Sequence, residues 1–213
     1  MRPTLNGFAC ETDRYGYRFE ASRSSQFNLT LPVLQPDGKT KEVDIRTLPF
    51  VRFEDNEGHS DGLYGFNVGE GVDRVGPDAK HPLVIRNLKL WDIHYAFRPE
   101  IPSVLVEDLK IIRAVYGVYH PDFNNHVYRR VYIGDTVSEP FNRGHDDENV
   151  QYGPFTVDGL VMERCNGTLI QVSQHSPTGK AAAHFRGVEF KDNKRDVAAY
   201  VDTTGEGQPK DPP

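Results

Sequence analysis

Five segments of the chain share one pattern of apolar and polar positions. They align on Leu88, Leu109, Val131, Leu160 and Val188, which are 21, 22, 29 and 28 residues apart. Apolar or aromatic residues also lie three positions before each anchor and two positions after it: Ile85, Val106, Tyr128, Val157 and Phe185, then Leu90, Ile111, Ile133, Met162 and Phe190. Such periods indicate a repeat architecture in which neighbouring segments stack and bury one continuous core.

The position two residues before each anchor is charged, and its sign alternates. It reads Arg86, Glu107, Arg129, Asp158 and Arg186. Stacked parallel strands lie about 4.8 Å apart, so aligned residues form columns, and opposite charges within one column stabilise the stack. A helical repeat is not predicted, since no segment has apolar residues at i, i+3, i+4 and i+7 over about ten positions.

Within each repeat we expect two short strands joined by a tight turn at Asn87, Asp108 or Gly159. A further strand is expected where an aromatic residue, a small residue and an aromatic or branched residue follow one another: Tyr15-Gly16-Tyr17, Tyr64-Gly65-Phe66, Tyr95-Ala96-Phe97 and Tyr116-Gly117-Val118. The small central residue indicates tight packing. We expect these aromatic residues to fill the core rather than to bind a cofactor.

Two regions interrupt the repeats. Residues 21–47 are polar and contain Pro36-Asp37-Gly38-Lys39, which predicts a hairpin turn between strands at 28–34 and 42–45. Residues 138–153 enlarge one repeat and are expected to form a loop. In stacked repeats such loops emerge on one side, which is often the functional side.

The whole chain is predicted to be all-β, with one parallel solenoid domain of about six coils over residues 1–200, an inserted β-hairpin and a flexible tail at 201–213. Its 213 residues are 37% hydrophobic, enough for one core. No apolar stretch approaches the ~18 residues of a membrane-spanning helix, so no membrane insertion is expected. The net charge of -6 argues against nucleic-acid binding. Cys10 and Cys165 predict neither a zinc site nor a disulfide framework.

Residues 84–90, 104–111 and 155–162 resemble the coils of right-handed parallel β-helix proteins, the pectate-lyase-like superfamily. Residues 53–66 are similar to coils of large secreted β-helix proteins that carry G8 domains. The resemblance covers about residues 8–200 and implies a single-stranded right-handed parallel β-helix. It also implies an extracellular or periplasmic location, although the N-terminus lacks the apolar region of a secretory signal.

The first repeat begins part-way, at Tyr15, with no capping helix before it. An uncapped end exposes strand edges, so we expect either that the natural protein is longer, with a neighbouring domain over this end, or that another subunit covers it. Polygalacturonase-type enzymes of this superfamily carry a characteristic series of sequence motifs in a fixed order. Gly144-His145 followed by Asp146-Asp147 departs from that series in order and spacing, so no catalytic role is transferred.

The densest polar cluster lies in the loop at 142–152. Arg143 could neutralise a sugar carboxylate while His145 or Tyr152 acts as the base of a uronic-acid lyase. Glycoside hydrolysis would instead need two carboxylates, for which Asp146, Asp147 and Glu148 are candidates. Asp146 and Asp147 could also bind calcium, and no other metal or cofactor is expected. The remaining alternative is a solvated loop whose charges pair with Arg129 or Arg130.

Four further residues are candidates for ligand binding: His59, His94, Tyr119 and Tyr152. His59 is placed in a loop by its Gly58-His59-Ser60-Asp61-Gly62 context, and Tyr119 is suited to stacking on sugars. His126 and His184 align with apolar residues of other repeats and are expected to be structural.

Two functions are consistent with the sequence. One is a non-catalytic module that binds carbohydrate or a protein partner along one elongated face. The other is a polysaccharide-active enzyme, a uronic-acid lyase or glycoside hydrolase, that uses the 142–152 loop with His59 or His94. An enzyme predicts that Arg143, His145 and an acid converge in a cleft. The absence of an intact family motif favours the module.

Overall fold

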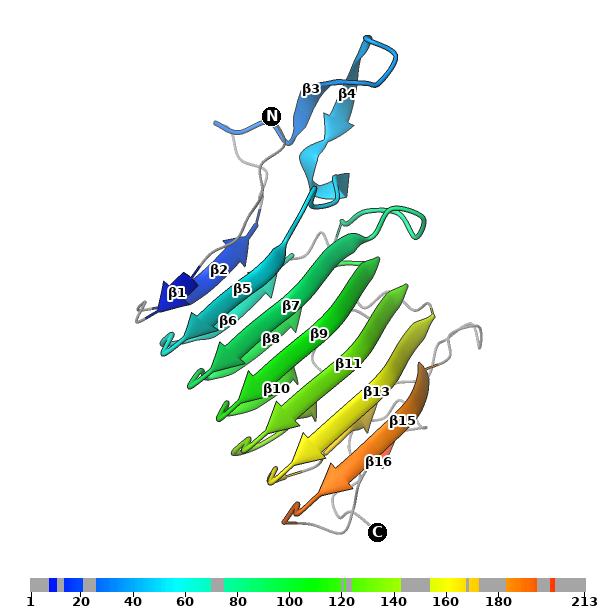
Figure 1. Ribbon diagram of the computed structural model, residues 1–213. Coiled ribbons are helices and arrows are strands. Elements are labelled where there is room, and N and C mark those ends of the chain that lie inside the picture. The colour runs from blue at the N-terminus through cyan, green and yellow to red at the C-terminus, as the bar shows by residue number, and fades with distance from the viewer. Residues whose placement is uncertain are drawn as a thin grey trace.

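The computed structural model describes residues 8–10, 14–20, 26–69, 75–119, 121, 124–142, 154–167, 169–172, 183–194 and 200–201. Over these residues the chain is all-β, as predicted, and contains no α-helix. Two parallel sheets dominate, and the chain passes from one to the other in each repeat (Figure 1).

The larger sheet has seven parallel strands in the order β1-β5-β7-β9-β11-β13-β15. Their bounds are β1 Phe8–Cys10, β5 Glu54–His59, β7 Leu83–Trp91, β9 Val104–Ile112, β11 His126–Gly134, β13 Phe155–Glu163 and β15 Ala183–Lys191. Each strand pairs with the strand of the preceding repeat and with that of the following one. The order of the sheet is therefore the order of the chain.

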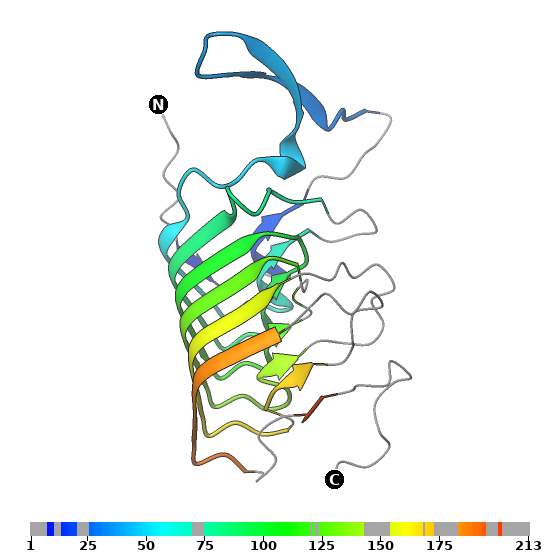
Figure 2. The same ribbon diagram turned by 90° about the vertical axis from the view of Figure 1, so that its right-hand side faces the viewer.

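The smaller sheet faces the larger one, and its strands follow one another along the stack in the same order as those of the larger sheet (Figure 2). It consists of β2 Tyr15–Phe19, β6 Tyr64–Val68, β8 Tyr95–Pro99, β10 Tyr116–Tyr119 and β12 Phe141–Asn142. Its first four strands begin at the tyrosines of the four aromatic motifs, which confirms the additional strand predicted there. A parallel pair, β14 Gln171–Val172 and β16 Tyr200–Val201, lies beyond β12.

The register of the larger sheet confirms the alignment made from the sequence. Leu88 pairs with Leu109, Leu109 with Val131, Val131 with Leu160 and Leu160 with Val188. The apolar columns on these anchors are buried from β7 to β13, between the two sheets. On β15 the corresponding side chains are more exposed, and Phe190 reaches 40%.

The tight turn expected at Asn87, Asp108 or Gly159 is wrong as a break between two strands. β7, β9 and β13 are each a single strand of nine residues that includes the expected turn position. The residue before each anchor has a left-handed backbone instead, with φ of 48° at Asn87, 59° at Asp108 and 80° at Gly159. Because Arg130 and Gly187 share this conformation, every strand bends at the same place and the pairing resumes on either side.

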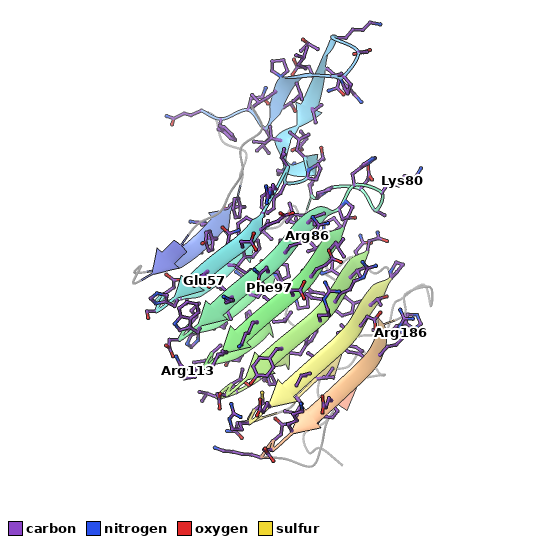
Figure 3. All side chains as sticks on the ribbon, viewed as in Figure 1. Glu57, Lys80, Arg86, Phe97, Arg113 and Arg186 are labelled. Carbon is purple, nitrogen blue, oxygen red and sulfur yellow. The ribbon has the colours of Figure 1, made fainter. Side chains whose placement is uncertain are left out.

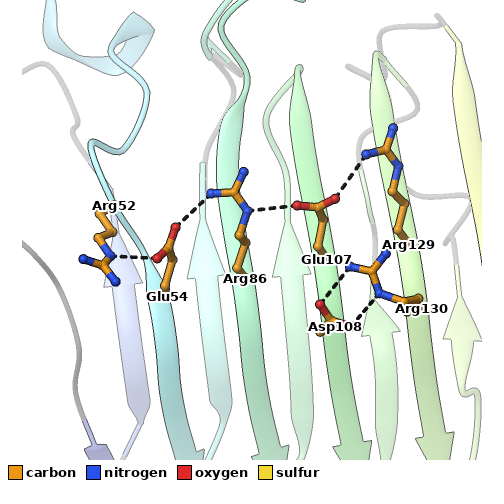
Figure 4. Close-up of polar contacts among 7 residues, drawn as sticks. All are labelled: Arg52, Glu54, Arg86, Glu107, Asp108, Arg129 and Arg130. Atoms are coloured by element: carbon orange, nitrogen blue, oxygen red, sulfur yellow. Dashed lines mark hydrogen bonds and ion pairs between the residues drawn. The ribbon is translucent and has the colours of Figure 1, made fainter.

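Alternating charges form a column of ion pairs across the larger sheet (Figure 4). Arg86 lies between Glu54 and Glu107, with nitrogen–oxygen distances of 2.8 Å and 2.9 Å. Arg129 contacts the other oxygen of Glu107 at 3.1 Å. The alternation predicted from Arg86, Glu107 and Arg129 is therefore confirmed, and we call this set, with Glu54, the Glu107 column.

A second set of ion pairs lies at the turn that follows each strand of the larger sheet. Arg113 donates two hydrogen bonds to Asp92, and Arg164 donates two to Asp135. Figure 3 shows Arg113 at this end of the sheet. Arg130 binds Asp108 in the same bidentate way. Arg129 and Arg130, expected as partners for the 138–153 loop, are thus held by acids of β9.

The predicted hairpin is confirmed. β3 Thr30–Leu34 and β4 Thr40–Asp44 pair antiparallel, and the turn between them is closed by a 2.8 Å bond from the Gln35 N–H to the Lys39 carbonyl. The short 3-10 helix η1, Ile45–Thr47, follows directly. The hairpin projects away from the two parallel sheets, beyond their first strands (Figures 1 and 2).

His126 is fully buried in the inward row that it shares with Val104 and Phe155, as predicted for a structural histidine. Its Nε2–H donates to the Ile101 carbonyl at 2.6 Å, and its Nδ1 accepts from the Tyr128 hydroxyl at 3.1 Å. Burial disfavours the imidazolium and lowers the pKa of His126 to about 4. His184, also expected to be structural, is exposed on β15.

Acidification should destabilise the fold through His126. In the unfolded chain this histidine takes up its proton near pH 6.5, whereas in the folded chain it does so only near pH 4. Its contribution is therefore present above pH 6.5 and is lost as the pH falls, by about 2 kcal/mol at pH 5. Urea unfolding between pH 7.5 and pH 4.5 measures this loss. His126→Gln should flatten the profile and the exposed His184→Gln should not; equal profiles for all three proteins would contradict the assignment.

Removing the shared acid of the Glu107 column should weaken the stack. Glu107→Gln leaves Arg86 and Arg129 without their common carboxylate, and we expect a loss of about 1 kcal/mol in the free energy of unfolding at low salt. At 1 M NaCl the loss should shrink because the charges are screened. Glu189→Gln, which removes one exposed pair with Lys191 at the last strand, is the control. An equal effect of the two variants would speak against a column.

Candidate functional site

Four tyrosines stack on one another across the smaller sheet. Tyr15, Tyr64, Tyr95 and Tyr116 are aligned in the register of β2, β6, β8 and β10. Successive ring centroids lie 5.3, 5.1 and 5.0 Å apart, with planes inclined by 20–25°. We call these four residues the tyrosine column.

The tyrosine column is half-buried, whereas the phenylalanines of the same motifs lie in the core. Phe66 and Phe97 have no exposed surface, and Tyr64 and Tyr95 keep part of theirs. The expectation that the motif aromatics all fill the core is therefore wrong for the tyrosines. A phenol hydroxyl needs a polar partner or water, which the apolar interior does not supply.

The small residue of each motif is required by the neighbouring backbone. A Cβ added to Gly65 would lie 2.8 Å from the Ala96 carbonyl oxygen and 2.6 Å from the Ile93 side chain. A Cβ added to Gly117 would lie 2.1 Å from the Pro140 carbonyl oxygen. Close approach at this position holds adjacent strands, and hence adjacent tyrosines, at the stacking distance.

The hydroxyls of the tyrosine column differ in their partners. The Tyr64 hydroxyl accepts a hydrogen bond from Arg98 at 3.2 Å. The hydroxyls of Tyr95 and Tyr116 make no hydrogen bond to any residue within the described ranges. Since these two rings are neighbours, they present two phenol hydroxyls, each able to donate and accept, side by side.

His94 and Tyr119 pack against the rings of this pair. The ring of Tyr119 lies 4.3 Å from that of Tyr95 and 5.1 Å from that of Tyr116. The His94 ring meets the same two tyrosines edge-on, at 4.3 Å and 5.5 Å. All four side chains are half-buried. We call Tyr95, Tyr116, Tyr119 and His94 the Tyr95–Tyr116 site.

Ion pairs lie beside the first two tyrosines of the column. The Arg98 guanidinium lies over the Tyr64 ring at 5.1 Å and binds Glu100 at 2.9 Å. Arg18 lies over Tyr15 at 4.4 Å and pairs with Glu20. Glu100 is almost completely buried, with 1% of its side chain exposed. Each arginine therefore combines a cation–π contact with a carboxylate two residues further along the chain, just after its strand ends.

Glu139 follows Tyr116 in the register, since both lie two residues before a paired position, Phe141 in β12 and Val118 in β10. Its carbonyl accepts a hydrogen bond from the Gly117 N–H at 3.1 Å. Burial raises the pKa of the Glu139 carboxyl, because the charged form loses hydration. A carboxyl group thus ends the column next to the Tyr95–Tyr116 site.

The structure brings together some of the residues chosen from the sequence and separates others. His94 and Tyr119 lie in the Tyr95–Tyr116 site. His59 does not: it is the last residue of β5, on the larger sheet, and its ring stacks on Trp91 at 4.5 Å. Its expected place in a loop is wrong, because the strand pairing extends through His59 and Trp91. Six candidates lie outside the described residues: Arg143, His145, Asp146, Asp147, Glu148 and Tyr152.

Sequence reasoning missed Tyr95, Tyr116 and the Arg98–Glu100 pair as site residues. A signal was available in the spacing Tyr-x-x-Arg-x-Glu, which occurs at Tyr15–Glu20 and again at Tyr95–Glu100. The register places the tyrosines of both motifs in one column, whereas Asn67 of β6 lies between Arg18 and Arg98. Apolar periodicity alone could not reveal it, because the tyrosines count equally as core residues.

Two hollows lie away from the tyrosine column. One, of about 240 Å3, is lined mainly by apolar side chains near η1, including Phe19, Phe50 and Ile101. The other, of about 230 Å3, lies on the larger sheet around Leu105 and Val127. Among the described residues, no group of three or more His, Cys, Asp and Glu side chains could hold a metal ion. The described part contains no convergent set of titratable groups in either hollow.

Enlarging the small residue behind the tyrosine column should destabilise the protein. Gly117→Ala forces a Cβ against the Pro140 carbonyl, and we expect a loss of about 2–3 kcal/mol in the free energy of unfolding. The control is Gly38→Ala in the hairpin turn, where φ is +81° but no atom lies within 4 Å, so only the backbone strain of about 1 kcal/mol applies. Urea unfolding compares the two. A Gly117→Ala protein as stable as the wild type would refute the close approach.

Comparison with other proteins adds no assignment. No protein-family model, no curated protein and no solved structure matches the chain. Among the described residues no helix has the length and apolar character needed to cross a membrane. Function is therefore inferred from the chemistry of the tyrosine column and its surroundings.

Proposed function

We propose that this chain is a right-handed parallel β-helix module, related to the pectate-lyase-like proteins, that binds carbohydrate along the tyrosine column. Two parallel sheets of matching order, with the chain passing between them once per repeat, support the architecture. An extracellular or periplasmic location, and a neighbouring domain or subunit over the first strands, belong to the same proposal.

The observation that carries the proposal is the pair of unbonded hydroxyls on Tyr95 and Tyr116. Both hydroxyls can bond to a ligand, and sugars supply donors and acceptors in close succession. His94 and Tyr119 pack against the two rings and add further aromatic surface and a ring nitrogen. Aromatic surface with a few polar groups side by side suits the recognition of a sugar.

The direction of the column favours an elongated ligand. Neighbouring strands are about 4.8 Å apart, so the tyrosines follow one another along the stack rather than along a strand. Their ring faces cover one another, so a ligand meets ring edges and hydroxyls. We therefore expect recognition by hydrogen bonds to a polymer that lies along the column, and not by stacking of sugars on a ring face.

The enzyme alternative stays a prediction. Its candidate groups, Arg143, His145 and the acids at 146–148, lie outside the described residues. A protein partner in place of a polysaccharide is an outcome that the following experiment distinguishes.

Binding should depend on the two unbonded hydroxyls. The Tyr95→Phe, Tyr116→Phe double variant keeps the stacked rings and removes only the hydroxyls. Loss of two hydrogen bonds of about 1 kcal/mol each should weaken binding about 30-fold. Affinity electrophoresis through a panel of dissolved polysaccharides, followed by calorimetry on those that retard the chain, measures the effect.

The matched control is Tyr132→Phe, which removes a hydroxyl that is bonded to Glu163 on the larger sheet. It should leave binding unchanged. Retardation by no polysaccharide would reject the carbohydrate and leave a protein partner as the alternative. Equal binding by the double variant and the wild type would place the site elsewhere on the molecule.

A further inference from the structure

We infer that the ligand of the tyrosine column is a neutral polysaccharide and not one rich in uronic acids. This inference rests on the proposed function and concerns only the chemistry of its ligand. Its basis is the state of the charged groups beside the tyrosines: the arginines that could bind a carboxylate are already bound to carboxylates of the chain itself.

Arg98 is the arginine nearest the centre of the column. Its guanidinium is held by Glu100 at 2.9 Å and by the Tyr64 hydroxyl at 3.2 Å. A ligand carboxylate could take over this guanidinium only by displacing Glu100, whose side chain is 1% exposed. That would leave a buried carboxylate without its counter-charge, which is among the costliest changes in a folded protein.

The first strand of the smaller sheet repeats this arrangement. Arg18 lies over Tyr15 and pairs with Glu20, the residue that follows this strand. Arg14 also lies over Tyr15, at 5.2 Å, and forms no ion pair with any described residue. Arg14 is therefore one exposed cation at the end of the column, and a polyanion would need a row of such cations along it.

The other cations beside the column are already paired: Arg18 with Glu20 and Arg98 with Glu100. A polymer with a carboxylate on every sugar would therefore meet no row of available cations there, and the lost hydration of its carboxylates would not be compensated. The Tyr95 and Tyr116 hydroxyls and the His94 ring can instead bond to sugar hydroxyls without any net charge on the ligand.

The experiment compares polymers that differ only in charge. A uronic-acid polysaccharide and its carboxyl-reduced derivative share one backbone, with each carboxylate replaced by a primary alcohol. For backbones that bind, the reduced polymer should bind at least about tenfold more tightly at 50 mM NaCl. Its affinity should change by less than about twofold up to 500 mM NaCl, since no ion pair with the ligand is formed.

The opposite preference would overturn the inference and leave the proposed function standing. This result would be tighter binding of the carboxylate form, weakened by salt. If neither the polymer pairs nor the wider polysaccharide panel bound, the proposed function would fail, and the inference with it.

An isosteric substitution that removes one negative charge tests the cause of the preference. Glu100→Gln keeps the size of the side chain and releases Arg98 from its counter-charge, so binding of the carboxylate polymer should rise about fivefold while the reduced polymer changes less than about twofold. Glu163→Gln, which removes a carboxylate from the larger sheet, should change neither. Glu20→Gln is a second variant at a more exposed pair, in case Glu100→Gln unfolds the chain. An unchanged preference in a folded variant would refute the role of these pairs.

Discussion

The two stacked sheets of this protein depend on the fixed register of their parallel strands. In such a stack each side chain has its own equivalent from the repeats before and after as its closest neighbours, about 4.8 Å away. A residue type therefore suits a position only if its side chain can pack against equivalent side chains from the repeats before and after. Aliphatic residues do so by packing in the core, and tyrosines by stacking. Charged residues are stabilised where the sign alternates, as in the Glu107 column. The like-charged neighbours Lys89 and Lys110 both lie exposed to solvent.

The same constraint explains how far the sequence could be interpreted. The anchors Leu88, Leu109 and Val131, the alternation of Arg86, Glu107 and Arg129, and the inward position of His126 all follow from comparing one repeat with the next. An alignment of the repeats with one another shows which residues form columns, and it needs no related protein. The hairpin is predictable for a different reason, because its turn chemistry is local.

Other features depend on backbone geometry that residue types do not determine. Asn87 and Asp108 are typical turn residues, yet here they bend a continuous strand, and Arg130 adopts the same left-handed conformation against its own preference. The tyrosines were assigned to the core because apolar periodicity does not separate an inward ring from a half-buried one. Only the positions of the Arg98 and Tyr64 side chains reveal that one side of the smaller sheet is polar, aromatic and largely neutralised by its own ion pairs.

The alternation of sign across the larger sheet also limits how such a chain can change in length. Removing the β9 repeat would bring Arg86 next to Arg129 and, at the following turn, Asp92 next to Asp135, so two columns would acquire like-charged neighbours at once. Removing two successive repeats would restore both alternations. In these two columns, repeats can therefore be removed without electrostatic conflict only in pairs.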